Sequence, residues 1–387
     1  MPAVAAHARA VGRTAFSVIR DWVREVPEPV IGLHLGAPEV PPPVQVTSAV
    51  EQAISLGRTG YAPDRGLPQL VEAIATKLAG KNCINADPEQ IVVTAGATQG
   101  LHLALTAVLN RGQEVLVPDP GWPVYSETVR MLGGRPVPYP MFPRDPFPSV
   151  ISSMIARIGP ATRAIVINSP SNPTGTVLTE SSLELVVDIA RRHDLWIVSD
   201  ECYESFTFES GHVSPGALAA GNVISCFSFS KTFAMPGMRV GYLVAPRSLA
   251  DVCVRLQAAS VCCVSTPAQY GALAGLEGSS RAVSDMKCDY LRRRNAATRF
   301  LRDAEISHVV PQGAFYVFAR VMTPGRRRRS EGDWEWAARL LNSHRVAVMP
   351  GSGFGSLGDG YVRIALTADD EKLTEGLRRV AMAYHTA

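Results

Sequence analysis

A lysine and an arginine lie eight residues apart in a stretch whose residue types could hold a carbonyl compound and a phosphate. Ser228-Phe229-Ser230-Lys231 follows an apolar run, and Arg239 comes after a loop that contains proline and glycine. A lysine amine in such a setting can form a Schiff base, while an arginine and two hydroxyls suit a phosphate. Pyridoxal phosphate offers both groups. Taken alone, this run favours a structural or surface role for Lys231, so the interpretation depends on the rest of the chain.

A switch from strand to helix precedes this stretch at residues 91–109. Ile91-Val92-Val93-Thr94 is β-branched and predicts a strand, residues 95–100 form a small-residue turn, and residues 101–109 have the apolar character of a helix. Backbone N–H groups at a helix start suit an anion, and Thr98 adds a hydroxyl. A tightly packed strand–helix turn without a ligand explains the same residues equally well.

Strands and helices alternate from there to the lysine. Residues 114–118, 164–167, 195–199 and 223–227 are predicted strands; Trp122 lies in a proline-bearing loop just beyond the first, and Asp200 ends the third. Such alternation favours a mostly parallel sheet with helices on both faces. Ligands of such sheets bind beyond the carboxyl ends of the strands, where these loops fall.

The chain is long enough for two unequal domains. Periodicity predicts further helices at residues 11–26, 44–56, 67–78, 183–193, 249–276, 284–301 and 373–383, and further strands at 31–36, 240–244, 314–318, 346–349 and 361–366. A proline cluster at residues 38–43 predicts a rigid linker between the domains. We expect residues 46–284 to form the large cofactor-binding domain. Residues 1–45 and 285–387 are expected to form a small domain built from both termini.

Composition indicates a soluble globular protein, with 46% hydrophobic and 19% charged residues and a formal net charge of +3. This balance is not typical of a nucleic-acid or membrane binder. No apolar run approaches the ~20 residues of a membrane span, and arginines interrupt the N-terminus where a signal peptide needs an apolar core, so we expect a cytoplasmic protein. The seven cysteines show no metal-ligand spacing, no metal site is predicted, and the cysteines are expected to be reduced core residues. The block Arg326–Arg329 is expected to be solvated.

Several separate motifs, in this order, resemble one family. The chain is similar to class I/II aminotransferases of the fold type I pyridoxal-phosphate superfamily, in particular the aspartate-aminotransferase-like group, from about Leu33 to the C-terminus. The motifs are Gly60-Tyr61-Ala62-Pro63, Ala95-Gly96-Ala97-Thr98-Gln99, Pro118-Asp119-Pro120-Gly121-Trp122-Pro123, Ser171-Asn172-Pro173-Thr174-Gly175, Asp200-Glu201-Cys202-Tyr203, Ser228-Phe229-Ser230-Lys231, Pro236-Gly237-Met238-Arg239, Gly313-Ala314-Phe315-Tyr316 and Val362-Arg363-Ile364. The resemblance implies an α/β fold: a large domain with a mostly parallel, mixed seven-stranded sheet between helices, plus a smaller α+β domain.

The resemblance also implies roles for the catalytic residues. Lys231 would form the Schiff base (internal aldimine) and then move a proton between the substrate and the cofactor. Asp200 would hold the pyridine nitrogen protonated, so that the ring accepts electrons. Tyr203 and Asn172 would donate hydrogen bonds to the phenolic oxygen, although Asn172 also suits a turn before proline. Trp122 would stack on the ring, with a plain core position as the alternative.

The phosphate and the substrate would be held by further residues that match the family. The implied phosphate-binding residues are Ala97, Thr98, Ser228, Ser230 and Arg239. Tyr61 would reach the phosphate of the neighbouring subunit, which implies a homodimer with composite sites. Arg363 would grip the substrate α-carboxylate in bidentate fashion, with a backbone N–H from Gly36 and with Trp122 and Asn172 beside it.

The sequence thus predicts a pyridoxal-phosphate-dependent aminotransferase that moves the amino group of an L-amino acid to a 2-oxo acid by a ping-pong mechanism. The main alternative is an enzyme of the same fold that diverts the quinonoid to oxidation, cyclisation, or γ-elimination and replacement in specialised metabolism. A non-enzymatic regulator built on this fold is a second alternative. No second arginine for a distal carboxylate is identified, and Thr14, Phe16 and Ser17 are candidates for shaping the side-chain pocket.

Overall fold

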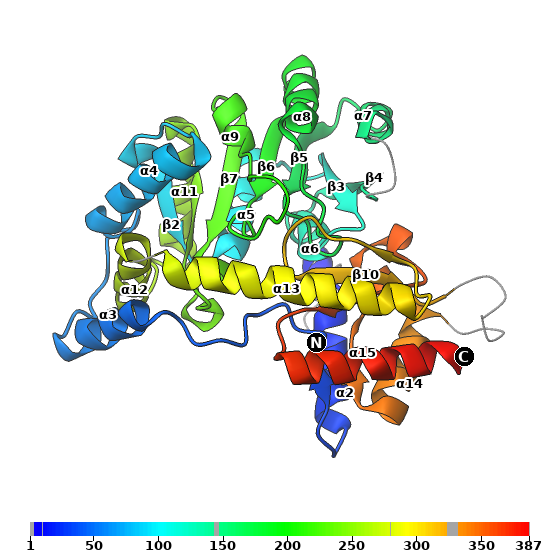
Figure 1. Ribbon diagram of the computed structural model, residues 1–387. Helices are drawn as coiled ribbons and strands as arrows, with labels where there is room; N and C mark the ends of the chain where they lie inside the picture. Colours follow the sequence, from blue (N-terminus) through cyan, green and yellow to red (C-terminus); the bar gives the residue numbers. More distant parts are fainter. Residues whose placement is uncertain (1–3, 10, 143–146, 279, 323–331, 387) are drawn as a thin grey trace.

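The computed structural model describes residues 4–9, 11–142, 147–278, 280–322 and 332–386. The predicted solvated block Arg326–Arg329 lies outside these residues. Figure 1 shows a large sheet with helices on both sides, next to smaller sheets that the beginning and the last third of the chain provide. The long helix α13 (Arg281–Asp303) runs along both parts.

The large sheet has seven strands in the order β2-β8-β7-β6-β5-β3-β4. In chain order the strands are β2 Ile91–Thr94, β3 Glu114–Asp119, β4 Arg135–Pro140, β5 Thr162–Asn168, β6 Trp196–Asp200, β7 Val223–Ser228 and β8 Gly241–Val244. Neighbouring strands are parallel except at β8, which runs antiparallel to β2 and β7. The predicted mostly parallel, mixed sheet is confirmed.

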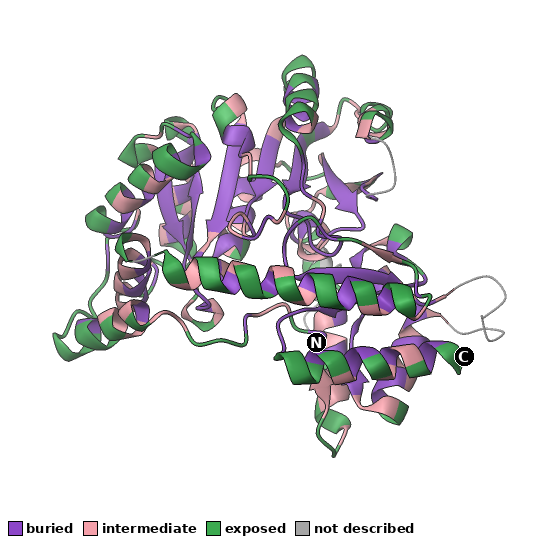
Figure 2. Ribbon diagram, in the orientation of Figure 1, coloured by how far each residue is buried: buried purple, intermediate pink, exposed green. Residues whose placement is uncertain are grey.

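Helices cover both faces of this sheet. Ala164 and Val166 of β5 pack with α5, α6 and α11, whereas Ile165 and Ile167 pack with α7 and α8 on the other face. Helices α4 and α12 join the sheet near β2 and β8. The bounds are α4 Pro68–Asn82, α5 Ala97–Val108, α6 Val124–Met131, α7 Phe147–Ile155, α8 Glu180–Arg192, α11 Arg247–Ser260 and α12 Thr266–Glu277. Apart from the edge strand β4, the strands of this sheet are therefore almost wholly buried, as Figure 2 shows.

The smaller part contains an antiparallel sheet in the order β12-β13-β10-β9 and a parallel pair, β1 with β11. Its strands are β1 Ile31–Gly32, β9 His308–Val309, β10 Tyr316–Arg320, β11 Val346–Ala347, β12 Met349–Pro350 and β13 Tyr361–Ala365. Val317 and Ala319 face α13, α14 (Asp333–His344) and α15 (Asp370–His385), whereas Phe318 faces α2 (Ala15–Glu25). A small domain is thus present, and its predicted boundaries at residues 45 and 285 stay a prediction.

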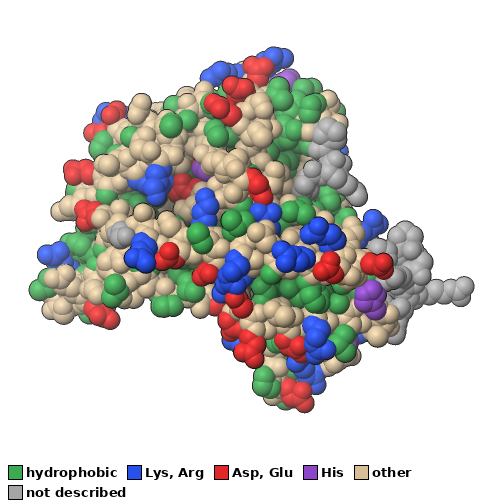
Figure 3. Space-filling view, in the orientation of Figure 1, with side chains coloured by type: hydrophobic (Ala, Val, Ile, Leu, Met, Phe, Trp, Pro, Cys, Tyr) green, Lys and Arg blue, Asp and Glu red, His purple; other side chains and the backbone are tan. Residues whose placement is uncertain are grey.

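The remaining elements are short, apart from α3. They are α1 Ala6–Arg9, α3 Val44–Ser55, α9 Pro215–Leu218 and α10 Phe229–Thr232, with the 3₁₀ helices η1 Pro88–Gln90, η2 Pro236–Met238, η3 Gly351–Phe354 and η4 Ser356–Gly358. In the part of the chain that the structure describes, no helix combines the length and apolar character needed to cross a bilayer. Basic and acidic side chains are interspersed over the face shown in Figure 3.

Three predicted elements are wrong in their extent. The strand predicted at residues 31–36 comprises only β1, Ile31–Gly32. Residues 249–276 form two helices, because Cys262 takes a positive φ of 65° and Pro267 occupies the first turn of α12. Proline has no N–H to continue a preceding helix. The predicted strand at residues 346–349 is likewise divided, since β11 pairs with β1 while β12 pairs with β13.

Strand β4 escaped the sequence analysis because proline fills alternate positions of Arg135–Pro140. Proline is tolerated at a sheet edge, where a missing N–H leaves no neighbour unpaired, and β4 is the edge strand beside β3. The prediction that the cysteines are core residues is wrong for Cys83, Cys262 and Cys288, which are exposed free thiols. Cys83 and Cys262 follow the ends of α4 and α11, and Cys288 lies on the exposed side of α13.

Candidate active site

A cavity of about 260 Å³ lies at the carboxyl edge of the large sheet, where it meets the small domain. Most of the predicted site residues line it. They are Gly36, Ala97, Thr98, Trp122, Asn172, Asp200, Tyr203, Ser228, Ser230, Lys231, Arg239 and Arg363. Parallel strands bring these residues together because their carboxyl ends share one edge.

Lys231 lies on the one-turn helix α10, directly after β7, and Ser228 caps that turn by accepting a hydrogen bond from the Ser230 N–H at 3.1 Å. The Lys231 amine donates a hydrogen bond to the Gly36 carbonyl of the small domain. Enclosure by the protein lowers the pKa of Lys231 to about 8, and the nearby Arg363 and Arg239 add to this effect. A larger fraction of this amine than of an ordinary lysine is therefore neutral, and nucleophilic, near neutral pH.

Asp200 ends β6 and is only 2% exposed. Its carboxylate accepts a hydrogen bond from the Tyr125 hydroxyl at 2.7 Å and from the Cys202 N–H at 3.2 Å. Burial raises the pKa of Asp200, and the hydrogen bond from Tyr125 opposes that rise. A buried carboxylate needs a positive partner, which a protonated ring nitrogen in the cavity would provide.

An anion cradle lies at the first turn of α5. Gly96 precedes the helix with a φ of 80° and without a side-chain cap, so the first N–H groups stay available. A Cβ at Gly96 would come within 2.7 Å of Arg239 Nη2, and hence only glycine lets the guanidinium approach. Arg239 Nη1 also lies 3.4 Å from the Ser230 hydroxyl oxygen. Guanidinium, hydroxyls and helix N-terminus together suit a phosphate.

Arg363 is fully buried on β13, opposite Phe318 of β10. Its guanidinium donates to the Asn172 side-chain oxygen at 2.9 Å and to the His34 carbonyl at 2.5 Å. Nε is buried and makes no hydrogen bond within the described part of the chain. The Tyr316 ring lies 4.3 Å from the Arg363 Cζ atom. Burial lowers the pKa of Arg363, so an incoming carboxylate would relieve an under-compensated charge.

A hydrogen-bond chain fixes the loop that carries Asn172. Asn168 pairs with Asp200 across β5 and β6, and its side-chain nitrogen donates to the Asp200 carbonyl at 2.9 Å. The Asn168 side-chain oxygen then accepts a hydrogen bond from the Asn172 N–H at 2.8 Å.

Two tyrosines meet at the cavity wall. The Tyr203 hydroxyl lies 2.7 Å from that of Tyr316, and burial raises the pKa of both. These residues are thus neutral hydrogen-bond donors at the cavity wall.

Several cavity residues were not among the predicted site residues, including Tyr125, Asn168, Cys202 and Tyr316. Tyr125 had a signal, since it follows Trp122 by three residues and helical spacing puts both on one side; their rings meet edge to face at 5.5 Å. Tyr316 is the last residue of the family motif Gly313-Ala314-Phe315-Tyr316. Nothing in the sequence around Asn168 indicated a role in the site, because a polar residue at a strand end suits a turn equally well.

Tyr61 does not line the cavity and is 91% exposed, in the segment between α3 and α4. Its role toward a neighbouring subunit stays a prediction, because the structure contains one chain. Of the three N-terminal candidates, Phe16 lines the cavity. Thr14 and Ser17 instead form the cap of α2, where the Ser17 hydroxyl donates to the Thr14 carbonyl at 2.7 Å.

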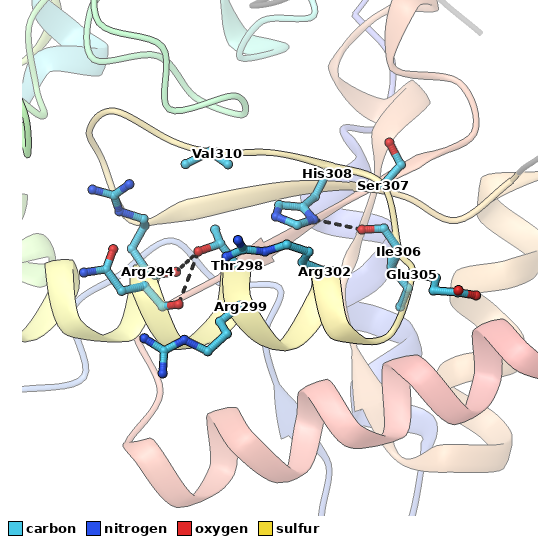
Figure 4. A pocket seen from close by; sticks show the side chains of 10 residues that line it. Arg294, Thr298, Arg299, Arg302, Glu305, Ile306, Ser307, His308 and Val310 are labelled. Carbon is cyan, nitrogen blue, oxygen red and sulfur yellow. Dashed lines mark hydrogen bonds between the residues drawn. The ribbon is translucent and has the colours of Figure 1, made fainter.

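A larger groove of about 750 Å³ runs along the end of α13 and the segment that follows it (Figure 4). Arg294, Arg299, Arg302 and His308 line it, and Arg294 is paired with Glu209 at 2.5 Å. The groove contains none of the predicted site residues. It is an open basic surface without a buried nucleophile, so we place the catalytic site in the smaller cavity.

The strand order of the large sheet and a lysine after β7 that faces an acid at the end of β6 define a class: a fold type I transferase that uses pyridoxal phosphate. Comparison with known proteins specifies the family. The family model for aminotransferase class I and II matches residues 28–380, and the chain belongs to that family. It is therefore an enzyme, a transferase of the aminotransferase class that depends on pyridoxal phosphate.

Relatives with different named activities resemble the chain to a similar degree. An aspartate aminotransferase of Pyrococcus abyssi is 38% identical, over 91% of this chain and 90% of its own length. An aromatic-amino-acid aminotransferase of Thermococcus litoralis is 37% identical, over 91% of each chain. The solved structure of Thermus thermophilus aspartate aminotransferase with maleate superposes with a TM-score of 0.91 at 32% identity, covering 99% of this chain and 100% of that one.

Proposed function

We propose that this enzyme transfers the amino group of an L-amino acid to a 2-oxo acid by a ping-pong mechanism. Lys231 Nζ would be the amine that condenses with the cofactor's carbonyl carbon, whose oxygen leaves as water. The observation that carries the proposal is the shared cavity of Lys231 and Asp200, with the anion cradle at Arg239 and the free Nε edge of Arg363 on the same walls. Pyridoxal phosphate, when bound, supplies a carbonyl that accepts amines and a ring that stabilises negative charge at the substrate α-carbon.

The residues of the chain each perform a separate task in this proposal. Asp200 holds a proton at the ring nitrogen, and the Tyr125 hydroxyl keeps that carboxylate ionised and oriented. The Lys231 amine, whose pKa burial lowers to about 8, would be set free when the substrate amine takes its place on the cofactor. It could then accept a proton from the substrate α-carbon and donate it to the cofactor. Arg363 orients the α-carboxylate. Because Lys231 also contacts Gly36 of the small domain, substrate binding is coupled to how the two domains close.

A homodimer with composite sites is part of the same proposal. Arg239 is exposed and borders a further hollow, separate from the cavity and the groove described above. This hollow lies on the side of α3 and α12 and is lined by Val50, Ile54, Met238 and Val264. Large apolar side chains are exposed on and beside α3, notably Val44 (75%), Ile54 (56%) and Leu56 (59%). A second copy that covers this surface would bring its Tyr61 toward the cradle at Arg239.

The test is a panel of amino acids mixed with the purified holoenzyme, each followed by the absorbance of the bound cofactor and by mass analysis of the product. A transaminating enzyme yields the matching 2-oxo acid and regains its starting spectrum only when a 2-oxo acid is added. Ammonia release, a cyclised product or consumption of oxygen would instead support one of the diverted reactions. Size and sedimentation measurements of the same sample test the dimer.

A further inference from the structure

Three cationic side chains line the catalytic cavity in the described part of the chain: Lys231, Arg239 and Arg363. The proposed function occupies each of them. Lys231 bonds the carbonyl carbon, Arg239 faces the phosphate and Arg363 holds the α-carboxylate. Within one subunit, a second carboxylate on the substrate would therefore find no further cation of the described cavity lining to pair with it.

His34 is the basic residue next to this set, and it adds no positive charge. It is 6% exposed, and its backbone carbonyl accepts the hydrogen bond from Arg363. Burial, with a further contribution from Arg363, lowers the pKa of His34 to about 4. The imidazole is therefore neutral at neutral pH.

Apolar side chains line the same cavity beside Arg363. Phe16, on the first turn of α2, lies with its ring 5.2 Å from the Arg363 Cζ atom and meets Phe354 edge to face at 5.9 Å. Leu35 also lines the cavity and is 49% exposed, although Leu33 two residues earlier is fully buried. A large apolar side chain that is exposed in a ligand cavity is available to contact an apolar ligand.

We propose that Phe16 and Leu35 select amino donors with neutral apolar or aromatic side chains over dicarboxylic amino acids, with Phe16 as the specificity-determining residue. This inference rests on the proposed function and names its substrate class. A carboxylate placed against these side chains would lose its water without gaining a partner, whereas an apolar side chain loses water favourably. Phe16 is held in place by α2, whose Ala15 and Ile19 pack against the small sheet.

Matched pairs of amino donors test the charge argument on the holoenzyme. Leucine and aspartate are similar in size, as are glutamine and glutamate, so each pair differs mainly in charge. The neutral member is expected to have a kcat/KM at least about 10-fold higher, the scale of discrimination by an apolar pocket. Equal or faster reaction of the acidic members overturns the inference and indicates a cation from elsewhere, such as a partner subunit. If no amino acid yields its 2-oxo acid, the proposed function itself fails.

A variant series tests Phe16 itself. Phe16→Ala is expected to lower kcat/KM for phenylalanine about 10-fold more than for alanine, whose side chain is too short to use the apolar wall. Phe16→Leu keeps an apolar side chain and is expected to restore most of the loss. Trp22→Phe is the control, because Trp22 lies on the same helix but packs on Trp334 at 5.7 Å, outside the cavity. An equal loss for both substrates in both Phe16 variants overturns the assignment, since Phe16 would then act only through Arg363.

Discussion

The two walls of the catalytic cavity are built in different ways. The wall at the large sheet comes from successive strand ends: Asn168 pairs with Asp200, and Asp200 pairs with Cys226 five residues before Lys231. The facing wall comes from segments hundreds of residues apart, because Phe16 and Gly36 come from the beginning of the chain and Arg363 from its last strand. Successive strands of one sheet position the first wall, whereas contacts between segments far apart in the chain position the second, among them the backbone hydrogen bonds of Leu33 to Ala347 and Ala365.

The two walls have different proposed roles: one carries the residues for the chemistry, and the other carries the residues that select the substrate. The groups proposed to act on the cofactor lie on the regular wall: Asp200 ends the paired strand β6, Lys231 lies on α10 directly after β7, and Arg239 follows η2. The groups proposed to contact the substrate lie on the packed wall, whose helix α2 and loops can change without disturbing the sheet. Changes to the first wall should therefore abolish turnover, while changes to the second should alter which amino acid is used.

The largest effect is expected for Lys231→Ala, which removes the amine of the regular wall. Turnover should fall by at least about 1000-fold, because both the covalent attachment and the proton transfer are lost. Cofactor should still bind through the anion cradle, without the absorbance of a bound lysine imine. Lys81→Ala, at an exposed position near the end of α4, is the control and should leave activity unchanged. Near-normal turnover of the Lys231 variant would contradict the proposed function.

Asp200→Asn is expected to have the next largest effect. The kcat should fall on the order of 100-fold, because a neutral amide no longer holds a proton at the ring nitrogen. The amide occupies the same space, so the melting temperature should change little. Asp188→Asn serves as the matched control, since Asp188 is exposed and pairs with Arg192 on α8. An unaffected rate would show that Asp200 takes no part in the chemistry. It would also contradict the proposal that the wall at the large sheet carries the chemistry.

Arg363→Lys tests the packed wall. A lysine keeps the charge but loses the fork of N–H groups, so kcat/KM for amino donors should fall about 10- to 100-fold, mainly through KM. Arg320→Lys on the neighbouring strand β10 is the control, because Arg320 lies in register with Tyr361 rather than with Arg363. A fall in kcat with KM unchanged would indicate that Arg363 contributes to the chemistry, and would break the separation between the two walls.

Tyr125→Phe should have the smallest effect on activity, and that effect should depend on pH. The Tyr125 hydroxyl opposes the rise that burial causes in the pKa of Asp200, so its removal lets that pKa rise further. Asp200 then takes up a proton at a higher pH as the solution is acidified. The acid limb of the kcat/KM profile should move to higher pH, with a loss of about 10-fold below it and little above. A uniform loss at every pH would mean that Tyr125 acts by packing alone.

Most of the fold and much of the site could be predicted from the sequence, for an identifiable reason. Parallel strands meet at one edge, so recognising the strands before Trp122, Asp200 and Lys231 was enough to expect their side chains in one place. The single helix expected at residues 249–276 failed because Pro267 starts a new helix rather than interrupting an old one. Asn168 and Tyr125 escaped because their contacts to Asp200 cross between elements.

The sequence by itself indicated the family, the cofactor and the alternation of strands and helices, because each depends on local residue patterns. The order of the strands in the large sheet came from the tertiary structure. Only the tertiary structure decided that Phe16 and Leu35 stand beside Arg363, that His34 is buried and neutral, and that Lys231 reaches across to Gly36. Those facts arise from segments far apart in sequence, whose side chains meet through packing of the small domain. No local pattern encodes such a meeting, since it depends on how the packed elements lie relative to one another.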